Sequence, residues 1–320
     1  MPSRSTNDGR AGRGGLRRLT FASAALLLLL SATADTSFGQ TPGRKLIVTA
    51  AGARLRERPE TAAAETGRLG LGAVVDGLER SADKSRVGST EEFWHLVAAP
   101  GGARGWVFGG LVAPYDPARR DETYLKLSAE RLANASATFA ELSELVRFLD
   151  RAAKEVTRRE ARAPLELARL NALARSLASF DIGAQDKEPY KSWTKEREAE
   201  IVYSEPAGQW YVRAELLWNL ELKYRGLPAA ERAAWAAAET PMPGECEGYL
   251  PCYLYMVTGM EGRYLKLYPR GPHPVYEVPR EDRANFSRSL ASLRAQLVRV
   301  PAAKKARLLG QLDAVARRFR

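Results

Sequence analysis

A change in composition around residues 114–120 constrains the fold more than any other feature of the sequence. Between residues 44 and 114, short aliphatic and β-branched runs lie between glycines and prolines, which is typical of short strands and tight turns. Beyond the change, alanine, leucine, glutamate and arginine dominate, and these residues favour helices. The 320 residues suffice for two domains. The sequence therefore predicts an all-β domain over 44–114, a linker over 115–121 and a mainly α-helical domain over 122–320.

Alternating side chains give the first predicted strand two faces. Leu55 lies between Arg54 and Arg56, so the strand should turn Leu55 inward and both arginines outward. Pro59 should end this strand, because proline cannot donate a hydrogen bond to a neighbouring strand. Five short strands in about 70 residues fit a small barrel that closes its own edges.

A hairpin is predicted in the second half of this β region. The runs 93–98 and 104–108 are rich in aliphatic and aromatic residues, and Pro100-Gly101-Gly102 lies between them as a turn. The preceding stretch, residues 79–92, is strongly charged and is expected to be a loop.

Four short motifs follow one another in residues 46–112. They are Leu55-Arg56-Glu57-Arg58-Pro59, Gly67-Arg68-Leu69-Gly70-Leu71-Gly72, Trp94-His95-Leu96-Val97 and Gly105-Trp106-Val107. In order and spacing this stretch, roughly a fifth of the chain, resembles the bacterial SH3 (SH3b) family. The resemblance implies an SH3-like barrel that binds a ligand, often a cell-wall peptide or glycan, and has no chemistry of its own. Arg54 and Arg58 stand where the family usually has Asn and Gly, near its usual ligand groove.

Candidate ligand contacts on this barrel combine arginines with aromatic rings. Arginine can bind carboxylates with two hydrogen bonds, and tryptophan can stack on a sugar or a peptide. The candidates are Arg54, Arg56, Arg58, Trp94, Trp106 and Phe108. The alternative is that Trp94 and Trp106 fill the small core and that the arginines are only solvated.

The first 39 residues are predicted to be a secretory signal peptide rather than part of the fold. Four arginines within residues 10–18 precede an apolar run over 21–30, and small residues at 32–34 and 37–39 offer cleavage sites. The alternative is a retained N-terminal membrane anchor, although the apolar run is short for a span of about 30 Å. The protein is therefore expected in the periplasm or outside the cell.

Two cysteines, Cys246 and Cys252, are present in the whole sequence. In an oxidising compartment the simplest expectation is a disulfide that closes a short loop over 246–252; free thiols or a redox pair are the alternatives. Two sulfurs without a nearby histidine cannot complete a zinc site, so no metal and no cofactor are expected.

The net charge of +11 is concentrated near the C-terminus. Residues 281–320 contain ten Lys or Arg and three Asp or Glu, a surplus of seven positive charges. Such a surplus attracts polyanions, and export argues against nucleic acid. We therefore expect an anionic partner, such as a lipid or a wall polymer, at a basic patch. The predicted patch consists of Lys304, Lys305, Arg307, Arg317 and Arg318.

Periodicity and local signals predict several amphipathic helices after residue 121. Thr138 and Glu141 have the spacing of a capping box, and Pro164 suits the first turn of the next helix. Residues 181–205 are expected to be rich in loops, and a helix is predicted to run from Ser204 through Trp218 and to stop at Gly226. A further helix should start at Pro228 and a loop should cover 240–252, while Phe286, Leu290 and Phe319 belong to two final amphipathic faces.

No catalytic motif stands out in the sequence. His95 and His273 are interpreted as structural or surface residues, and no Ser-His-Asp arrangement or metalloprotease motif is present. Glu200, Glu205 and Glu215 lie near aromatic residues of the span 190–224 and would be the candidates for a glycosidase, which needs two carboxyl groups across a cleft. The sequence therefore favours an exported cell-envelope binding or adaptor protein that recognises a wall peptide, a glycan or another envelope protein. The alternative is a cell-wall hydrolase with an unrecognised helical catalytic domain.

Overall fold

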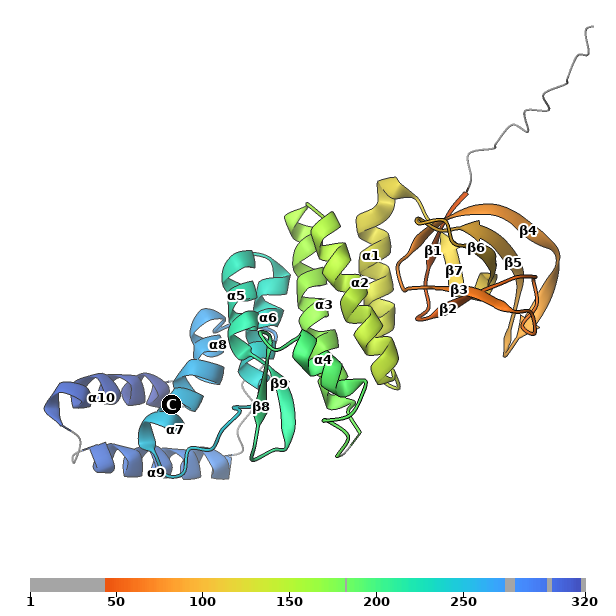
Figure 1. Ribbon diagram of the computed structural model, residues 1–320. Helices are drawn as coiled ribbons and strands as arrows, with labels where there is room; N and C mark the ends of the chain where they lie inside the picture. The colour runs from red at the N-terminus through yellow and green to blue at the C-terminus, as the bar shows by residue number, and fades with distance from the viewer. Residues whose placement is uncertain (1–43, 182, 274–279, 298–300, 318–320) are drawn as a thin grey trace, which may run out of the picture. The chain divides into compact units, whose positions relative to one another are not determined.

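The computed structural model describes residues 44–181, 183–273, 280–297 and 301–317. In these ranges a curled antiparallel sheet comes first and a helical region follows, as Figure 1 shows. The predicted order of a β part before a helical part is therefore confirmed. The predicted signal peptide, residues 1–39, lies outside the described residues.

Seven strands form the curled sheet. They are β1 Arg44–Val48, β2 Ala53–Arg56, β3 Glu65–Leu69, β4 Val74–Val87, β5 Thr90–Ala98, β6 Arg104–Phe108 and β7 Val112–Pro114, with the 3-10 turn η1 Gly109–Leu111 before β7. Neighbouring strands pair in the order β3-β2-β6-β5-β4-β1-β7, so β3 and β7 are the two edges. The prediction of a barrel closed by five strands is thus corrected to a half-barrel of seven.

The charged stretch 79–92 is not a loop but most of a long hairpin. β4 and β5 pair antiparallel almost to their common turn, with Ser85 opposite Glu92 and Val87 opposite Thr90. Many of its side chains are exposed on both faces, so the apolar alternation that would reveal a strand is missing. Backbone hydrogen bonds between β4 and β5, rather than the burial of apolar side chains, stabilise this hairpin.

The inner face of the sheet holds a small apolar core. Leu55 is fully buried in it, while Arg54 is exposed and Arg56 is half-buried, which confirms the predicted alternation. The core is built by Leu46, Val48, Ala53, Leu55, Leu69, Val75, Val97 and Val107.

The segment between sheet and helices is short and tied to the sheet. The Tyr115 N–H donates to the Lys45 carbonyl at 2.9 Å. The side chain of Asp116 then accepts from the Ala118 N–H at 2.9 Å and opens the 3-10 turn η2, Pro117–Arg119. This turn leads directly into the first α-helix.

Three long helices follow. They are α1 Arg120–Ala133, α2 Phe139–Glu155 and α3 Arg159–Ala178. The capping box of Thr138 and Glu141 is present in both of its hydrogen bonds, as predicted. Pro164 lies in the second turn of α3 and not in the first, because the helix already begins at Arg159, where the Arg162 N–H donates to the Arg158 carbonyl.

The region 181–226 differs most from its prediction. It contains α4 Tyr190–Glu196, the hairpin of β8 Ile201–Ser204 and β9 Gln209–Val212, and α5 Ala214–Tyr224. The helix predicted from Ser204 is therefore wrong up to residue 213. Ile201 and Val212 are paired and buried, and Tyr203 packs on Trp210 across the hairpin, so β-branched and aromatic residues stabilise strands here.

The remaining helices complete the chain. They are α6 Pro228–Glu239, α7 Leu250–Tyr255, the π-helical turn η3 Met256–Glu261, α8 Gly262–Leu267, α9 Arg280–Gln296 and α10 Ala302–Ala316. The predicted stop at Gly226 and restart at Pro228 are confirmed. Leu254, Leu297 and Leu312 form a buried cluster that joins α7, α9 and α10. The side chain of Phe286 and residue Phe319 lie outside the described parts.

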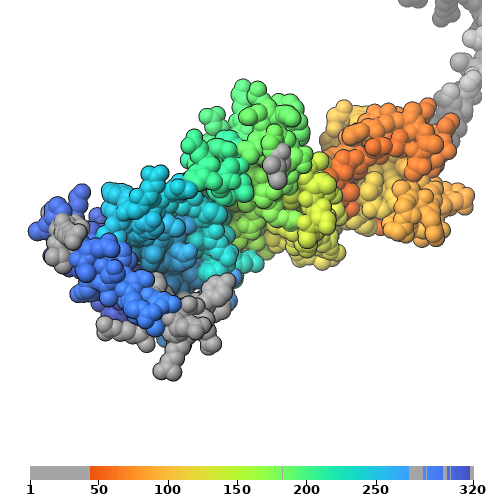
Figure 2. Space-filling model, turned by 90° about the horizontal axis from the view of Figure 1, so that it is seen from below, coloured from red at the N-terminus to blue at the C-terminus, as the bar shows by residue number. Residues whose placement is uncertain are grey.

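The largest core cluster runs through the helices and reaches the sheet. Figure 2 shows the residues of this part of the chain, coloured from yellow to cyan, as one packed surface. Leu71, in the connection before β4, is buried with Phe148 of α2 in this cluster. Arg151 of α2 also donates to the Leu71 carbonyl at 2.9 Å, so hydrogen bonds accompany the apolar contact. Over the described ranges, no helix combines the length and the apolar character that a membrane span requires.

Candidate functional site

Of the predicted barrel arginines, Arg54 and Arg56 lie on β2 and Arg58 lies in the loop that follows, and each of the three has a polar neighbour. Arg54 is exposed and its Nε lies 3.4 Å from an oxygen of Glu65, while Arg58 forms an ion pair with Glu60 at 2.9 Å. Arg56 Nη1 donates to the carbonyl of Ala63 at 2.9 Å, which fixes the position of its guanidinium group.

Trp94 and Phe108 are buried. Their exposed fractions are 3% and 4%, and the two rings meet edge to face at 5.6 Å. Trp94 was a candidate either for ligand contact or for the core, and its burial favours the core. Trp106 differs from both in burial alone, because its side chain is only partly buried.

Cross-strand pairing places Trp106 in the middle of one row of side chains. Arg56 pairs with both Glu65 and Trp106, Trp106 pairs with Leu96, and Leu96 pairs with Glu79. Directly opposed residues in antiparallel strands project from the same face. The row Glu65–Arg56–Trp106–Leu96–Glu79, here called the Trp106 row, is therefore a surface with an apolar centre, one fixed cation and an acid at each end.

The two histidines occupy different environments. His95 lies on β5, and its partial burial together with Arg44 and Arg80 lowers the pKa of its imidazole. His273 stacks on Trp235 with ring centroids 4.3 Å apart, and its Nε2 lies 3.7 Å from Glu231. Both arrangements agree with the structural interpretation of these residues.

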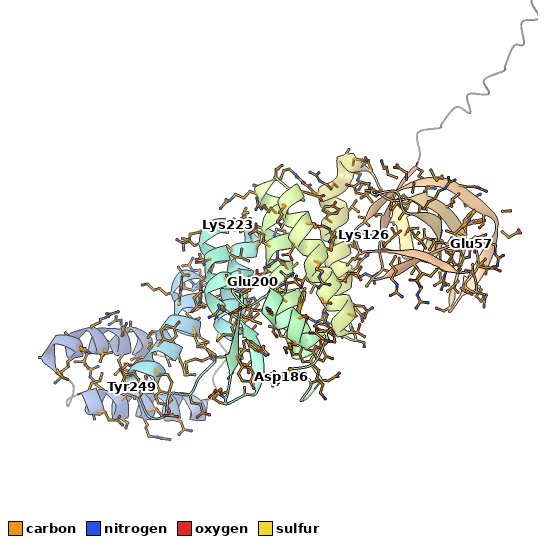
Figure 3. All side chains as sticks on the ribbon, in the orientation of Figure 1. Glu57, Lys126, Asp186, Glu200, Lys223 and Tyr249 are labelled. Atoms are coloured by element: carbon orange, nitrogen blue, oxygen red, sulfur yellow. A yellow bond between two sulfur atoms is a disulfide. The ribbon has the colours of Figure 1, made fainter. Side chains whose placement is uncertain are left out.

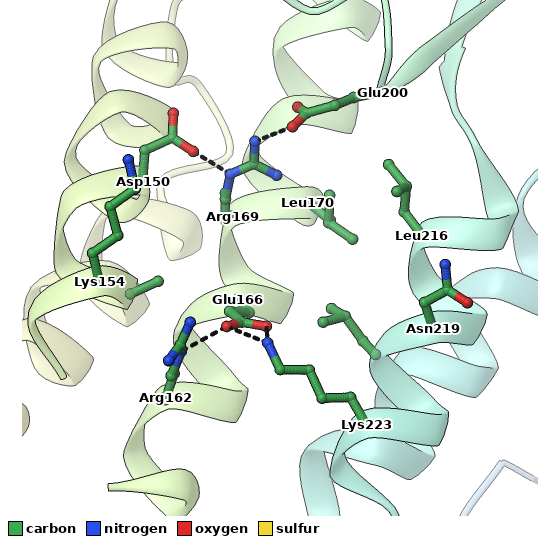
Figure 4. A pocket seen from close by; sticks show the side chains of 12 residues that line it. Asp150, Lys154, Arg162, Glu166, Arg169, Leu170, Glu200, Leu216, Asn219 and Lys223 are labelled. Carbon is green, nitrogen blue, oxygen red and sulfur yellow. Dashed lines mark hydrogen bonds and ion pairs between the residues drawn. The ribbon is translucent and has the colours of Figure 1, made fainter. Parts of the chain in front are cut away.

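A charged cavity lies between α2, α3 and α5, and we call it the α3 cavity (Figure 4). Its volume is about 400 Å³. The lining residues are Asp150, Ala153, Lys154, Arg162, Glu166, Arg169, Leu170, Glu200, Leu216, Asn219, Leu220 and Lys223. The labels of Glu200 and Lys223 in Figure 3 show where the α3 cavity lies in the helical region.

At one end of the α3 cavity, Arg169 lies between two carboxylates. Its Nε donates to Asp150 and its Nη2 donates to Glu200, as Figure 4 shows. Arg197 donates to the other oxygen of Asp150 at 2.8 Å. Burial opposes ionisation of Asp150, but the hydrogen bonds and charges of Arg169 and Arg197 outweigh it and lower the pKa of the carboxyl group.

At the other end, Glu166 accepts hydrogen bonds from two cations. Arg162 Nε and Lys223 Nζ both donate to Glu166 Oε1 at 2.8 Å, and Lys223 Nζ also donates to Oε2 at 2.7 Å. Burial again works against the charge, yet the bonds from Lys223 and Arg162 keep the pKa of Glu166 below its ordinary value. Both ends of the cavity are therefore ionised near neutral pH.

The three glutamates proposed for a hydrolase do not share a pocket. Glu200 lines the α3 cavity, Glu205 lies in the β8–β9 turn, and Glu215 is exposed in the first turn of α5. Asp150 and Glu166 carry lowered pKa values, whereas a glycosidase acid needs a raised one. Asp150, Glu166 and Glu200 instead form ion pairs with neighbouring arginine and lysine side chains.

Cys246 and Cys252 form the predicted disulfide, with Cα atoms 5.4 Å apart. Disulfides are typical of proteins outside the cytosol. Three tyrosines beside it are largely exposed: Tyr249, Tyr253 and Tyr255.

Four of the five residues of the predicted basic patch are described. Lys304, Arg307 and Arg317 are exposed and Lys305 is half-buried. Within the described ranges these four side chains form no ion pair, so they offer uncompensated positive charge. Arg318 lies outside the described residues.

The α3 cavity was missed by the sequence analysis, although one signal was present. Arg162, Glu166 and Arg169 recur at helical spacing on one face of α3, while most of the other α3 positions are apolar. Such a charged stripe on an otherwise buried helix indicates ionic partners on neighbouring helices. The partners themselves, on α2 and α5, follow only from the fold.

A scan against protein-family models matched none of them, and a search of curated proteins found no significant match.

Proposed function

We propose that this protein is an exported cell-envelope binding protein whose SH3-like half-barrel holds a wall peptide, a glycan or an envelope protein without catalysing a reaction. The observation that supports this most directly is the Trp106 row. The motif resemblance of residues 46–112 and the disulfide, which suits an oxidising compartment, support it as well.

The Trp106 row has the features of a stacking site. The partly exposed indole of Trp106 and the side chain of Leu96 provide an apolar surface for a sugar ring or a peptide. Arg56 is held by the Ala63 carbonyl, so little side-chain entropy is lost when it binds an acceptor on the ligand. The ends of the row add polar groups that can select among ligands.

The carboxylates of the helical region favour binding over hydrolysis. Asp150 and Glu166 are held in the ionised state by arginine and lysine, and Glu205 and Glu215 do not face Glu200 across the α3 cavity. A glycosidase would need a protonated carboxyl group opposite an ionised one.

Binding to purified wall sacculi tests this proposal, with the chain lacking residues 1–39. We expect Trp106→Ala to reduce retention at least about fivefold, because one stacked ring contributes on the order of 1–3 kcal/mol. Tyr203→Ala is the matched control, because it removes an exposed aromatic ring, 40% accessible, from the separate β8–β9 hairpin. Equal retention of both variants, with melting curves like the parent, would contradict a role for the Trp106 row.

Zymography of the same chain on embedded wall material addresses the alternative. A cleared zone would contradict a purely binding function. Retention on sacculi without clearing would agree with the proposal.

A further inference from the structure

The α3 cavity is large enough for a small organic molecule. Its volume of about 400 Å³ falls within the range of roughly 300–1,000 Å³ that small-molecule sites occupy. Leu170, Leu216 and Leu220 supply an apolar middle between the two ionic ends. Figure 4 shows Lys154 and Arg162 on one side of the cavity and Asn219 and Lys223 on the other.

Most of the hydrogen-bonding capacity that remains in the α3 cavity belongs to donors, and Oε2 of Glu200 is one buried acceptor without a hydrogen-bond partner among the described residues. Both oxygens of Asp150 and both oxygens of Glu166 already accept hydrogen bonds. Toward the described residues, in contrast, Arg162 donates from Nε alone and Arg169 donates from Nε and Nη2 alone. A guanidinium group carries five N–H donors, so each arginine retains donors for a ligand.

The lining also carries an excess of positive charge. Four cations, Lys154, Arg162, Arg169 and Lys223, face three carboxylates, which leaves a surplus of one positive charge. Lys154 is exposed and forms no ion pair with the described residues. Unused donors and a positive surplus both favour an anion.

We propose that the α3 cavity binds a small organic carboxylate. The carboxylate group accepts hydrogen bonds from the unused donors of Arg162 and from Lys154, and the hydrocarbon part packs on Leu170, Leu216 and Leu220. The bidentate geometry of arginine suits a carboxylate. The existing ion pairs hold Arg162 and Lys223 in place before the ligand arrives, which lowers the entropy lost on binding. This site does not depend on the Trp106 row or on a wall ligand.

Hexanoate is a suitable probe, because it combines one carboxylate with a short apolar chain. We expect saturation-transfer NMR on the chain lacking residues 1–39, at low ionic strength, to give a Kd of about 1 mM for hexanoate. Hexan-1-ol should bind at least about fivefold more weakly, because a charged hydrogen bond is lost. Hexylammonium should give no signal. Inorganic phosphate should compete weakly, because it cannot use the apolar lining.

Two variants and one control locate the site. Lys154→Gln should weaken hexanoate binding by about threefold to tenfold without unfolding the protein, since Lys154 has no ion pair with a described residue to lose. Arg162→Gln should weaken it at least as much, with a melting curve to confirm that the fold is kept. Lys126→Gln on α1 is the matched control, with a side chain that is 78% exposed, and should bind as the parent does.

Three results would overturn the proposal. They are hexanoate binding that is unchanged in Lys154→Gln and Arg162→Gln, binding of hexan-1-ol as tight as that of hexanoate, or binding of phosphate as tight as that of hexanoate. The last of these would identify a site for inorganic anions only.

Discussion

Lys223 of α5 places its Nζ 2.7 Å from Oε2 of Glu166 on α3, and so joins two helices that are 57 residues apart in the chain at these positions. Arg162 contacts the same carboxylate from one turn earlier on α3. The side chain of Glu166 is only 14% exposed, so its charge depends on these two partners. The arrangement stabilises the α3–α5 contact and orients the cations that line the α3 cavity.

Glu166→Gln should lower the stability at neutral pH by about 1–3 kcal/mol, because charged hydrogen bonds from Lys223 and Arg162 are lost. Burial opposes the charge of Glu166, but Lys223 and Arg162 prevail and its folded pKa lies below 4.5. A depressed folded pKa gives stability that is present above the unfolded pKa and is lost as the pH falls through the folded value. The difference between parent and variant should therefore shrink below about pH 4.5. Urea unfolding at several pH values measures it, with Glu130→Gln on the exposed face of α1 as the control, and a difference that does not change with pH would contradict the assignment.

Gly72→Ala should destabilise the protein more than Gly52→Ala. Both glycines have left-handed backbones, with φ of +74° and +59°, so alanine costs about 1–2 kcal/mol at either position. A Cβ atom at Gly72 would clash with the ring of Phe148, whereas a Cβ atom at Gly52 would have no heavy atom of the described residues within 4 Å. Overpacking should add about 1–3 kcal/mol at Gly72 alone. Thermal unfolding of both variants measures the difference, and equal losses would show that Phe148 does not pack on the Gly72 turn.

Thr138→Ala should cost about 1 kcal/mol, because the Thr138 hydroxyl caps the Glu141 N–H and the Glu141 carboxylate caps the Thr138 N–H. The expected change is a lower denaturation midpoint in urea with an unchanged slope. Ser136→Ala is the control, because among the described contacts only the backbone N–H of Ser136 is bonded locally, to Asn134. A loss of equal size in both variants would mean that hydroxyl groups near α2 matter for another reason.

The features that the sequence predicts correctly are those with local causes. The capping box at Thr138, the stop at Gly226 and the inward Leu55 each depend on neighbours within a few residues. The Cys246–Cys252 pair belongs to the same group, because the two cysteines are six positions apart.

The features that the sequence does not reveal have long-range causes. Ser204 and Pro206 carry the signals of a helix start, but the pairing of Ile201 with Val212 and the burial of both residues select a hairpin instead. The α3 cavity needs Asp150, Glu166 and Lys223 from three helices, and no spacing in the sequence specifies which helices meet. The position of Trp106 likewise follows from strand register, which depends on the pairing of distant segments.

Arg225→Met should destabilise the protein by about 3 kcal/mol or more, because it leaves the carboxylate of Glu221 buried without its main partner. The side chain of Glu221 is 1% exposed, and both of its oxygens accept hydrogen bonds from Arg225, at 2.9 and 2.8 Å. Those bonds, against the opposing effect of burial, keep the pKa of Glu221 low in the parent. Without Arg225, burial should raise this pKa, so the variant should gain stability relative to the parent as the pH falls from 7 towards 5.

The double variant Glu221→Gln/Arg225→Met removes the buried charge and should recover part of the loss at pH 7. Urea unfolding of the single and double variants at both pH values tests this, and a single variant as stable as the double one would mean that the contact of Tyr268 with Glu221 and the nearby charge of Arg263 suffice to hold the carboxylate.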